Sequence, residues 1–332
     1  PAGLTGPVFC SLNRNKRSVV FDMKNEEDKA VVWSLLDHAD VVVNNFRAGV
    51  MERMGFGYDV LSKRNPRLIY AVGTGFGLIG PYAHKGGQDV LAQAMSGVMH
   101  RRSDDSLPLS IYSTTFADYS AGMHLVQGVL LALLQRQQTG RGQLVSVSLY
   151  NSMLAAQTQE AASLMMRERE VNWGAMPLSG VFATQDSALV MVGAFKSHPL
   201  RDICKALEIE DLSQDLRFFD HTSQVKHKAE LHAIFRTIFV TQTTSYWIDK
   251  LEEQDLLCAP VRTLAEALAD EQTLINGMIL QTNNRVETVR VVGSPIHLTD
   301  APVSIRIPPP ELGQHTQDVK AEQQCLLDKG AK

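Results

Sequence analysis

One stretch, residues 114–143, constrains the fold more than any other part of the chain. It opens with small polar residues of the kind that flank a helix start. It then runs almost entirely apolar from Ala121 to Leu134, and it ends at Gly140 and Gly142, which favour a helix end. A helix that is apolar on most sides is typical of the inside of a large domain. The sequence therefore predicts a long buried helix, followed at once by a strand over residues 144–150.

Asp118 is the one acid in this stretch. An aspartate at this place can cap the helix, because its side chain accepts hydrogen bonds from the first main-chain N–H groups. The alternative is a carboxylate held at the positive end of the helix, where it stays ionised and can act as a nucleophile. Spacing alone favours the cap, so the nucleophile needs support from elsewhere in the chain.

Size and composition exclude several classes of protein. The 332 residues indicate about two domains, and 44% hydrophobic with 20% charged residues is typical of a globular protein. The formal net charge of -4 argues against a nucleic-acid partner. We see no apolar run that approaches a membrane span and no signal peptide, so no membrane partner is expected. Four scattered cysteines without a C-x-x-C pair favour reduced thiols and a cytoplasmic location.

Strands and helices alternate in the first part of the chain. Strands are expected at 18–23, 40–43 and 67–72, with a helix at 26–38 and short helical pieces at 50–54 and 58–62. This alternation predicts a parallel α/β sheet. Ligands gather at the carboxyl ends of such strands, where Asn45, Phe46 and the 73–80 glycine loop would lie.

The glycine loop invites a second interpretation. Gly75, Gly77 and Gly80 match the spacing of a dinucleotide-binding fingerprint and follow a strand. That fingerprint requires a helix to open at the last glycine, but Pro81 and another glycine pair come next. An NAD site is therefore disfavoured, while a tight loop that lets the main chain approach a ligand stays plausible.

Further helices are expected at 89–99 and 152–168, and composition changes after residue 171. A hairpin over 180–184 and 188–193, helices at 199–207, 226–239 and 245–254, and strands at 258–262 and 286–292 indicate a smaller α+β unit. A last helix is expected near 317–327. The ten histidines lack the short paired spacings of a metal site, so no metal is expected.

Four stretches carry a resemblance to a known family: 13–24 (NRNKRSVVFDMK), 45–56 (NFRAGVMERMGF), 118–143 and 308–319 (PPPELGQHTQDV), with 259–270 in addition. Together and in this order they resemble the class III coenzyme A transferases of the CaiB/BaiF type, the group of formyl-CoA transferase and carnitine CoA-transferase. The likeness runs from about Leu12 to the end.

The resemblance implies a doubly wound α/β large domain, a smaller α+β domain and an interlocked homodimer. We expect the large domain at 1–171, the small domain at 172–284 and a return to the large domain at 285–332. The family's N-terminal strand and helix have no counterpart here, so an N-terminal segment is expected to be missing. If that segment targets the protein, an organelle matrix becomes the expected location.

The family's catalytic aspartate corresponds to Asp118, which would attack an acyl-CoA thioester and pass through an aspartyl anhydride and an aspartyl-CoA thioester. A carboxylate is ionised at neutral pH and needs no general base for this attack. Main-chain N–H groups at the helix start, or from the loop 173–180, would stabilise the oxyanions. The enzyme would move CoA between small carboxylic acids, with the CoA thioester as substrate and no tightly bound cofactor.

The resemblance also implies a CoA site, with Arg53 meeting the nucleotide phosphates. The other matching positions are Asn45, Phe46, Met54, Phe21 and Lys24. Without the resemblance, Phe21 and Met54 would be interpreted as ordinary core residues, and Lys24 and Arg53 as surface charges. Gln88 and Asp89 are expected in the substrate pocket, where Gln88 would bond the far carboxylate of a dicarboxylic acid.

Three other functions remain open. An acyl-CoA racemase or epimerase of the same superfamily needs a histidine where this chain has Gln88, and an amide cannot exchange a proton at a useful pKa. A non-catalytic CoA-binding protein is a second alternative. A dinucleotide oxidoreductase is the third.

Overall fold

The computed structural model describes residues 6–104, 106–283 and 288–330. Its larger part holds a three-stranded parallel sheet of β1 (Val41–Asn44), β2 (Ile69–Thr74) and β3 (Leu144–Ser148). β2 lies in the middle, with Val41 opposite Ile69 and Tyr70 opposite Leu144. The parallel α/β sheet that the sequence predicts is thus present. The described strands run in chain order, so they do not show the reversal of strand order that marks a doubly wound sheet.

The two faces of the sheet are covered by different helices. One face carries α2 (Glu26–His38), α3 (Val50–Arg53) and α4 (Tyr58–Arg64), where Tyr70 and Val72 pack in a cluster with Phe56 and Leu61. Side chains alternate between faces along a strand. Ala71 and its neighbour Val145 therefore face the other side, where α6 (Phe116–Thr139) crosses β2 and β3 at Gly128.

Helix α6 has the extent that its sequence predicts, and it ends at Gly140 with a positive φ of 70°. Its expected burial is wrong. Ala117, Ala121 and Ala132 are its buried residues, whereas four large apolar side chains are 54–67% exposed: Val126, Leu130, Leu131 and Leu134. The reason is that this chain covers only the side of the helix that lies on the sheet.

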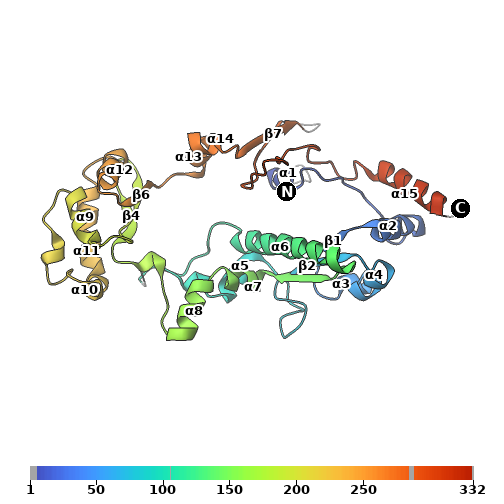
Figure 1. Ribbon diagram of the computed structural model, residues 1–332, viewed down its shortest axis with the longest axis horizontal. Helices are drawn as coiled ribbons and strands as arrows, with labels where there is room; N and C mark the ends of the chain where they lie inside the picture. The colour runs from blue at the N-terminus through green and yellow to red at the C-terminus, as the bar shows by residue number, and fades with distance from the viewer. Residues whose placement is uncertain (1–5, 105, 284–287, 331–332) are drawn as a thin grey trace.

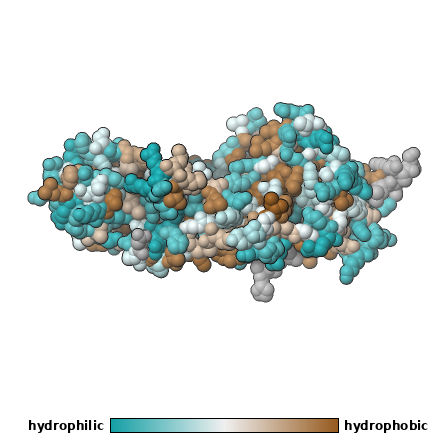
Figure 2. Space-filling model, turned by 90° about the horizontal axis from the view of Figure 1, so that it is seen from below, coloured by the Kyte–Doolittle hydropathy of each residue, from teal (hydrophilic) through white to brown (hydrophobic). Residues whose placement is uncertain are grey.

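By length and composition alone, α6 is long and apolar enough to cross a membrane, so the expectation that no apolar run approaches a membrane span is wrong for this helix. A core helix passes the same test, and α6 packs along one side on the sheet. In Figure 2 apolar residues lie on the molecular surface, mixed with polar ones, over the wider end of the molecule.

Two local predictions are wrong. Residues 18–23 form no strand; their main chain instead bonds to the returning C-terminal part, with Val20 N–H donating to Thr316 Oγ1 at 3.0 Å and His315 N–H donating to Ser18 O at 2.9 Å. The helix expected over 152–168 is broken into α7 (Leu149–Ala155) and α8 (Thr158–Arg167).

A second unit follows, built on the antiparallel sheet of β4 (Ser179–Ala183), β5 (Ala188–Val192) and β6 (Leu257–Pro260). The predicted hairpin is confirmed as β4 and β5. Helices α9 (Pro199–Ala206), α10 (His221–Lys226), α11 (Lys228–Phe239) and α12 (Thr244–Glu253) surround a core that includes Phe182, Phe235 and Trp247.

The chain then returns along the top of Figure 1 to the larger part. This return contains α13 (Leu264–Ala269), α14 (Glu271–Ile275) and the hairpin of β7 (Ile279–Asn283) and β8 (Thr288–Val292), against which α1 (Pro7–Leu12) packs. The last helix, α15 (Thr316–Gly330), lies beside α2, where Ser34 Oγ donates to Gln323 Oε1 at 2.9 Å. The predicted boundary between residues 284 and 285 and the start of the strand expected at 286–292 lie outside the described residues.

Short elements complete the description: α5 (Asp89–Met95) and the 3-10 helices η1 (Val98–His100), η2 (Trp173–Ala175) and η3 (Leu212–Gln214).

Candidate active site

Asp118 lines a cavity of about 460 Å³ at the carboxyl end of the parallel sheet. The walls come from the end of β1 with Asn45 to Ala48, from the end of β2 with Gly73 to Gly75, from the loop before α5, and from the first turns of α6. The site thus forms where loops leave the strands, as expected for ligands of an open α/β sheet.

Asp118 does not cap its own helix. Thr115 occupies the N-cap position without a side-chain cap, and Asp118 is the third residue of α6. The cap comes instead from Asp89, whose Oδ2 accepts the N–H groups of Ala117 at 2.7 Å and of Asp118 at 3.0 Å. No described residue donates a hydrogen bond to the Asp118 carboxylate, which leaves its oxygens available to a ligand.

The Asp118 side chain is exposed in this chain, although neighbouring atoms exclude part of its solvent. This partial burial, followed by the negative charge of Asp89, raises the pKa of the Asp118 carboxyl above its ordinary value near 4. The group is therefore more basic than a free aspartate, which suits a nucleophile.

The structure brings some of the predicted site residues together and separates others. Asn45 and Phe46 line the cavity with Asp118. Arg53 and Met54 lie outside the lining, at the end of α3. Phe21 and Lys24 are also elsewhere: Lys320 Nζ lies 6.0 Å from the Phe21 ring, and the Lys24 N–H donates to Asp22 Oδ1 at 2.9 Å.

The two residues expected in the substrate pocket are placed beside it. Gln88 is the N-cap of α5 and is exposed, and its neighbour Gly87, not Gln88, lines the cavity. Asp89 is 6% exposed and is not a lining residue; it is buried under the start of α6. Both oxygens of Asp89 are engaged within the protein, since main-chain N–H groups bond to one and Gln93 Nε2 bonds to the other, so the lining of the cavity gives the expected substrate contact no support.

Sequence reasoning missed two cations of the cavity, Arg47 and Lys85. The guanidinium of Arg47 lies over Gly86, since a Cβ on that glycine would come 2.7 Å from Arg47 Nη2. A signal was available: Arg47 directly follows Asn45 and Phe46, and Lys85 directly precedes the glycine pair. Both positions adjoin segments that already pointed to a ligand.

The structure also bears on the alternatives. No helix opens at Gly80, since α5 begins only at Asp89, so the dinucleotide fingerprint lacks its helix. Among the residues that line the cavity in the described chain there is no histidine, which a racemase would need. Within 6–104, 106–283 and 288–330 no group of three His, Cys, Asp or Glu side chains is arranged to hold a metal ion.

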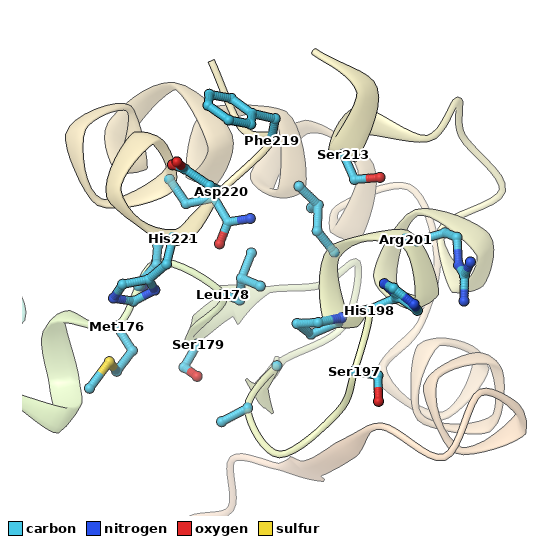
Figure 3. Close-up of a pocket in the computed structure, with 16 residues that line it drawn as sticks. Met176, Leu178, Ser179, Ser197, His198, Arg201, Ser213, Phe219, Asp220 and His221 are labelled. Atoms are coloured by element: carbon cyan, nitrogen blue, oxygen red, sulfur yellow. The ribbon is translucent and has the colours of Figure 1, made fainter. Parts of the chain in front are cut away.

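The loop 173–180, which was expected to supply oxyanion donors, does not line the Asp118 cavity in this chain. Residues 176–179 instead line a second cavity of about 370 Å³ in the smaller unit. Figure 3 shows Met176 and His221 on one side of it and His198 and Arg201 on the other.

Comparisons with known proteins identify the family of this chain. Residues 3–316 match the family model described as CoA-transferase family III. An acyl-CoA transferase of Fusarium pseudograminearum is 34% identical over 329 residues, covering 96% of this chain and 72% of that protein. The succinyl-CoA:glutarate CoA-transferase of Mus musculus is 31% identical, covering 97% and 75%.

A solved structure shares the fold as well. The CAIB/BAIF family protein of Brucella suis superposes with a TM-score of 0.84 at 27% identity, covering 96% of this chain and 84% of that one. The chain belongs to CoA-transferase family III. It is an enzyme of the class III CoA-transferases, as its sequence motifs predict.

Proposed function

We propose that this enzyme moves CoA between small carboxylic acids with Asp118 as its covalent nucleophile. One observation carries the proposal. Asp118 lines the cavity together with Asn45, Phe46 and the glycine loop, and no described residue donates a hydrogen bond to its carboxylate. A nucleophile must have its attacking oxygen accessible to the substrate. In a family of CoA-transferases, that substrate is a thioester.

The reaction then proceeds in balanced steps. An Asp118 oxygen attacks the thioester carbonyl, the C–S bond breaks, and CoA thiolate leaves a mixed anhydride. The thiolate attacks the Asp118 carbonyl carbon and expels the donor acid, giving an aspartyl-CoA thioester. The acceptor carboxylate attacks that thioester, forming a second anhydride and CoA thiolate. Attack of the thiolate on the acceptor acyl group gives the new acyl-CoA and restores Asp118.

The oxyanions formed in these steps need donors other than the start of α6. Asp89 takes the N–H groups of Ala117 and Asp118, and the Tyr119 N–H donates to Thr115 O at 3.0 Å. The main chain of Gly86 and Gly87 lines the cavity instead. We assign the oxyanion contacts to that segment, because fixed N–H groups next to the reacting carbon stabilise developing charge.

We propose dicarboxylic acids as the first substrates to test. Arg47 and Lys85 give the cavity two positive charges next to one carboxylate. A dicarboxylate has a second negative group to meet such a cation, and a guanidinium binds a carboxylate in a fork geometry. The mouse relative is named for succinyl-CoA and glutarate, so that pair is the natural starting point.

The homodimer is also part of this proposal. The apolar side chains of α6 that one chain leaves exposed form a continuous face, with Leu130, Leu131 and Leu134 within five residues of one another. Exposed apolar faces of this kind mark interaction surfaces. A second copy of this chain is the occupant that the family resemblance implies, and it would bury that face.

The test is mass spectrometry of the peptide that contains Asp118. The enzyme is incubated with succinyl-CoA, and the product is reduced with borohydride, which attacks an aspartyl thioester but not a free carboxylate. We expect reduced Asp118 in the wild type. An Asp28→Asn variant, which removes a different carboxylate of the larger part, serves as the control and should still give the reduced peptide.

Unmodified Asp118 across a panel of acyl-CoAs, in protein that binds CoA, would overturn the mechanism. Retention of CoA exchange in an Asp118→Ala variant would also contradict it. Inversion at the α-carbon of a 2-methyl-branched acyl-CoA, without transfer of labelled CoA to an acceptor acid, would point to the racemase instead.

A further inference from the structure

We infer that Asp89 is a positioning residue for the reaction: its buried carboxylate fixes the first turn of α6 and holds a negative charge behind the nucleophile. This inference rests on the proposed function, because it takes Asp118 as the group that attacks. Asp89 itself touches no substrate, since it lies outside the lining of the cavity.

The hydrogen bonds of Asp89 define its task. The residue is 6% exposed, and one carboxylate oxygen accepts the N–H groups of both Ala117 and Asp118, at 2.7 and 3.0 Å. A side chain from another helix thus takes the role of an N-cap, which Thr115 does not perform. The bond to the Asp118 N–H fixes the main chain of the nucleophile directly.

The second oxygen of Asp89 extends this support to the preceding loop. It accepts a hydrogen bond from Gln93 Nε2, and Gln93 is completely buried. Gln93 Oε1 in turn accepts the Tyr112 N–H at 3.0 Å, and its Nε2 lies 3.4 Å from Thr114 O. One carboxylate therefore connects α5, the loop that enters α6 and the first turn of α6.

Charge adds a second effect. The start of α6 would normally stabilise an ionised Asp118, but Asp89 already occupies the N–H groups there. Burial and then Asp89 raise the pKa of Asp118. The other charged groups at the cavity are Arg47, from the loop after β1, and Lys85, from the loop before α5; α7 contributes only Leu149. Asp89 is thus the one negative neighbour among the described residues at this cavity.

The test compares Asp89→Asn with Asp89→Ala. The Asn side chain keeps an oxygen for the two N–H groups but removes the charge and the acceptor for Gln93 Nε2, whereas Ala removes all of these. The Asp118 carboxyl is titrated by NMR in protein with 13C-labelled aspartate, and its signal is assigned by its absence from Asp118→Asn. Asp28→Asn is the control, because Asp28 is also a buried carboxylate of the larger part, 7% exposed and bonded to the Asp22 N–H at 2.7 Å.

We expect Asp89→Asn to move the Asp118 titration and the acid limb of the kcat/KM profile to lower pH, with KM for acyl-CoA unchanged. Asp89→Ala should lower kcat by about 10- to 100-fold as well, because a misplaced nucleophile loses its alignment. Asp28→Asn should leave both the titration and the profile where they are.

An unmoved Asp118 titration in Asp89→Asn would overturn the inference, as would a raised KM, which would place Asp89 in contact with substrate. Because the NMR titration needs no turnover, it separates the two proposals. If the titration moves but Asp118 is never acylated, the proposed function fails while the link between the two carboxylates stands.

Discussion

Gly75 and Gly87 bring their main chains into direct contact beside Asp118. A Cβ on Gly75 would lie 2.4 Å from Cα of Gly87, and a Cβ on Gly87 would lie 2.3 Å from Cα of Gly75. Both glycines line the cavity, so this contact joins the loop after β2 to the loop before α5. Only glycine permits such an approach, because any side chain would meet main-chain atoms that cannot rotate away.

Replacing Gly87 should therefore disturb the site and the stability together. We expect Gly87→Ala to lower the free energy of unfolding by about 1–3 kcal/mol, the usual range for overpacking, and to reduce kcat. Urea denaturation and CoA exchange would measure both. Gly122→Ala is the stability control, since a Cβ there meets nothing within 4 Å. Equal unfolding free energies in the two variants would contradict the prediction.

The raised pKa of Asp118 has a consequence for stability. An acid whose pKa is higher in the folded protein holds its proton more tightly there, so its contribution is most favourable below the ordinary value near 4. That contribution is lost as pH rises through the folded pKa. At neutral pH, the ionised Asp118 therefore lowers stability, by a small amount because the side chain is exposed.

We thus expect Asp118→Asn to unfold at a slightly higher temperature than the wild type at pH 7, while the proposed mechanism predicts that the variant is inactive. The difference should disappear at pH 3, where the carboxyl is protonated in both states. Thermal unfolding at the two pH values would measure it. A lower unfolding temperature for Asp118→Asn at pH 7 would show that the ionised group stabilises the fold.

The contact between α2 and α15 can be tested by removing the hydrogen bond between Ser34 and Gln323 and measuring the free energy of unfolding. Ser34 is 3% exposed, Gln323 is 8% exposed, and they bond at 2.9 Å. Removing either partner leaves a buried polar group alone, so Ser34→Ala and Gln323→Ala should each cost about 1–3 kcal/mol. A double-mutant cycle should show that the two changes are not additive. Additive losses would mean that the two side chains do not interact in solution.

The exposed face of α6 leads to a prediction about assembly. Leu131 is 67% exposed, and a charge there should prevent a second copy from covering the helix. We expect the wild type to sediment as a dimer and Leu131→Glu as a monomer. Leu216→Glu, at an 83% exposed leucine of the smaller unit, should leave the dimer intact. A wild-type monomer, or a Leu131→Glu dimer, would contradict the proposed dimer.

Periodicity and glycine positions predicted the elements that depend on local sequence. Helices α2 and α6, strands β1, β2 and β3, and the hairpin of β4 and β5 lie where the pattern puts them. The segment 18–23 has a strand-like composition but finds no strand partner, because the N–H groups of Ser18 and Val20 bond to side chains of His315 and Thr316, almost 300 positions away. No local pattern contains that information.

Local sequence patterns likewise predicted only part of the site. Asn45 and Phe46 were predicted at the ligand-binding edge, because the carboxyl ends of parallel strands meet there, and they line the same cavity as Asp118. The role of Asp89 was not predicted, because a cap normally comes from the residue just before the helix, whereas here it comes from a residue 28 positions before Ala117. Burial of α6 was overestimated because an apolar sequence shows that a helix face is apolar but not how much of that face the same chain covers.

The pairing of the early residues with the returning C-terminal segment has a consequence for synthesis. Arg17 bonds to Glu322 at 2.9 and 3.0 Å, Asn15 N–H donates to Ile307 O at 2.8 Å, and Ser34 is bonded to Gln323. These partners leave the ribosome only after the smaller unit has been made, and domains generally fold as they emerge. The smaller unit can therefore fold first, before α15 is available to pack against α2. Folding of the larger part should finish only after α15 has emerged from the ribosome, and a change that keeps α15 from packing on α2 should slow it.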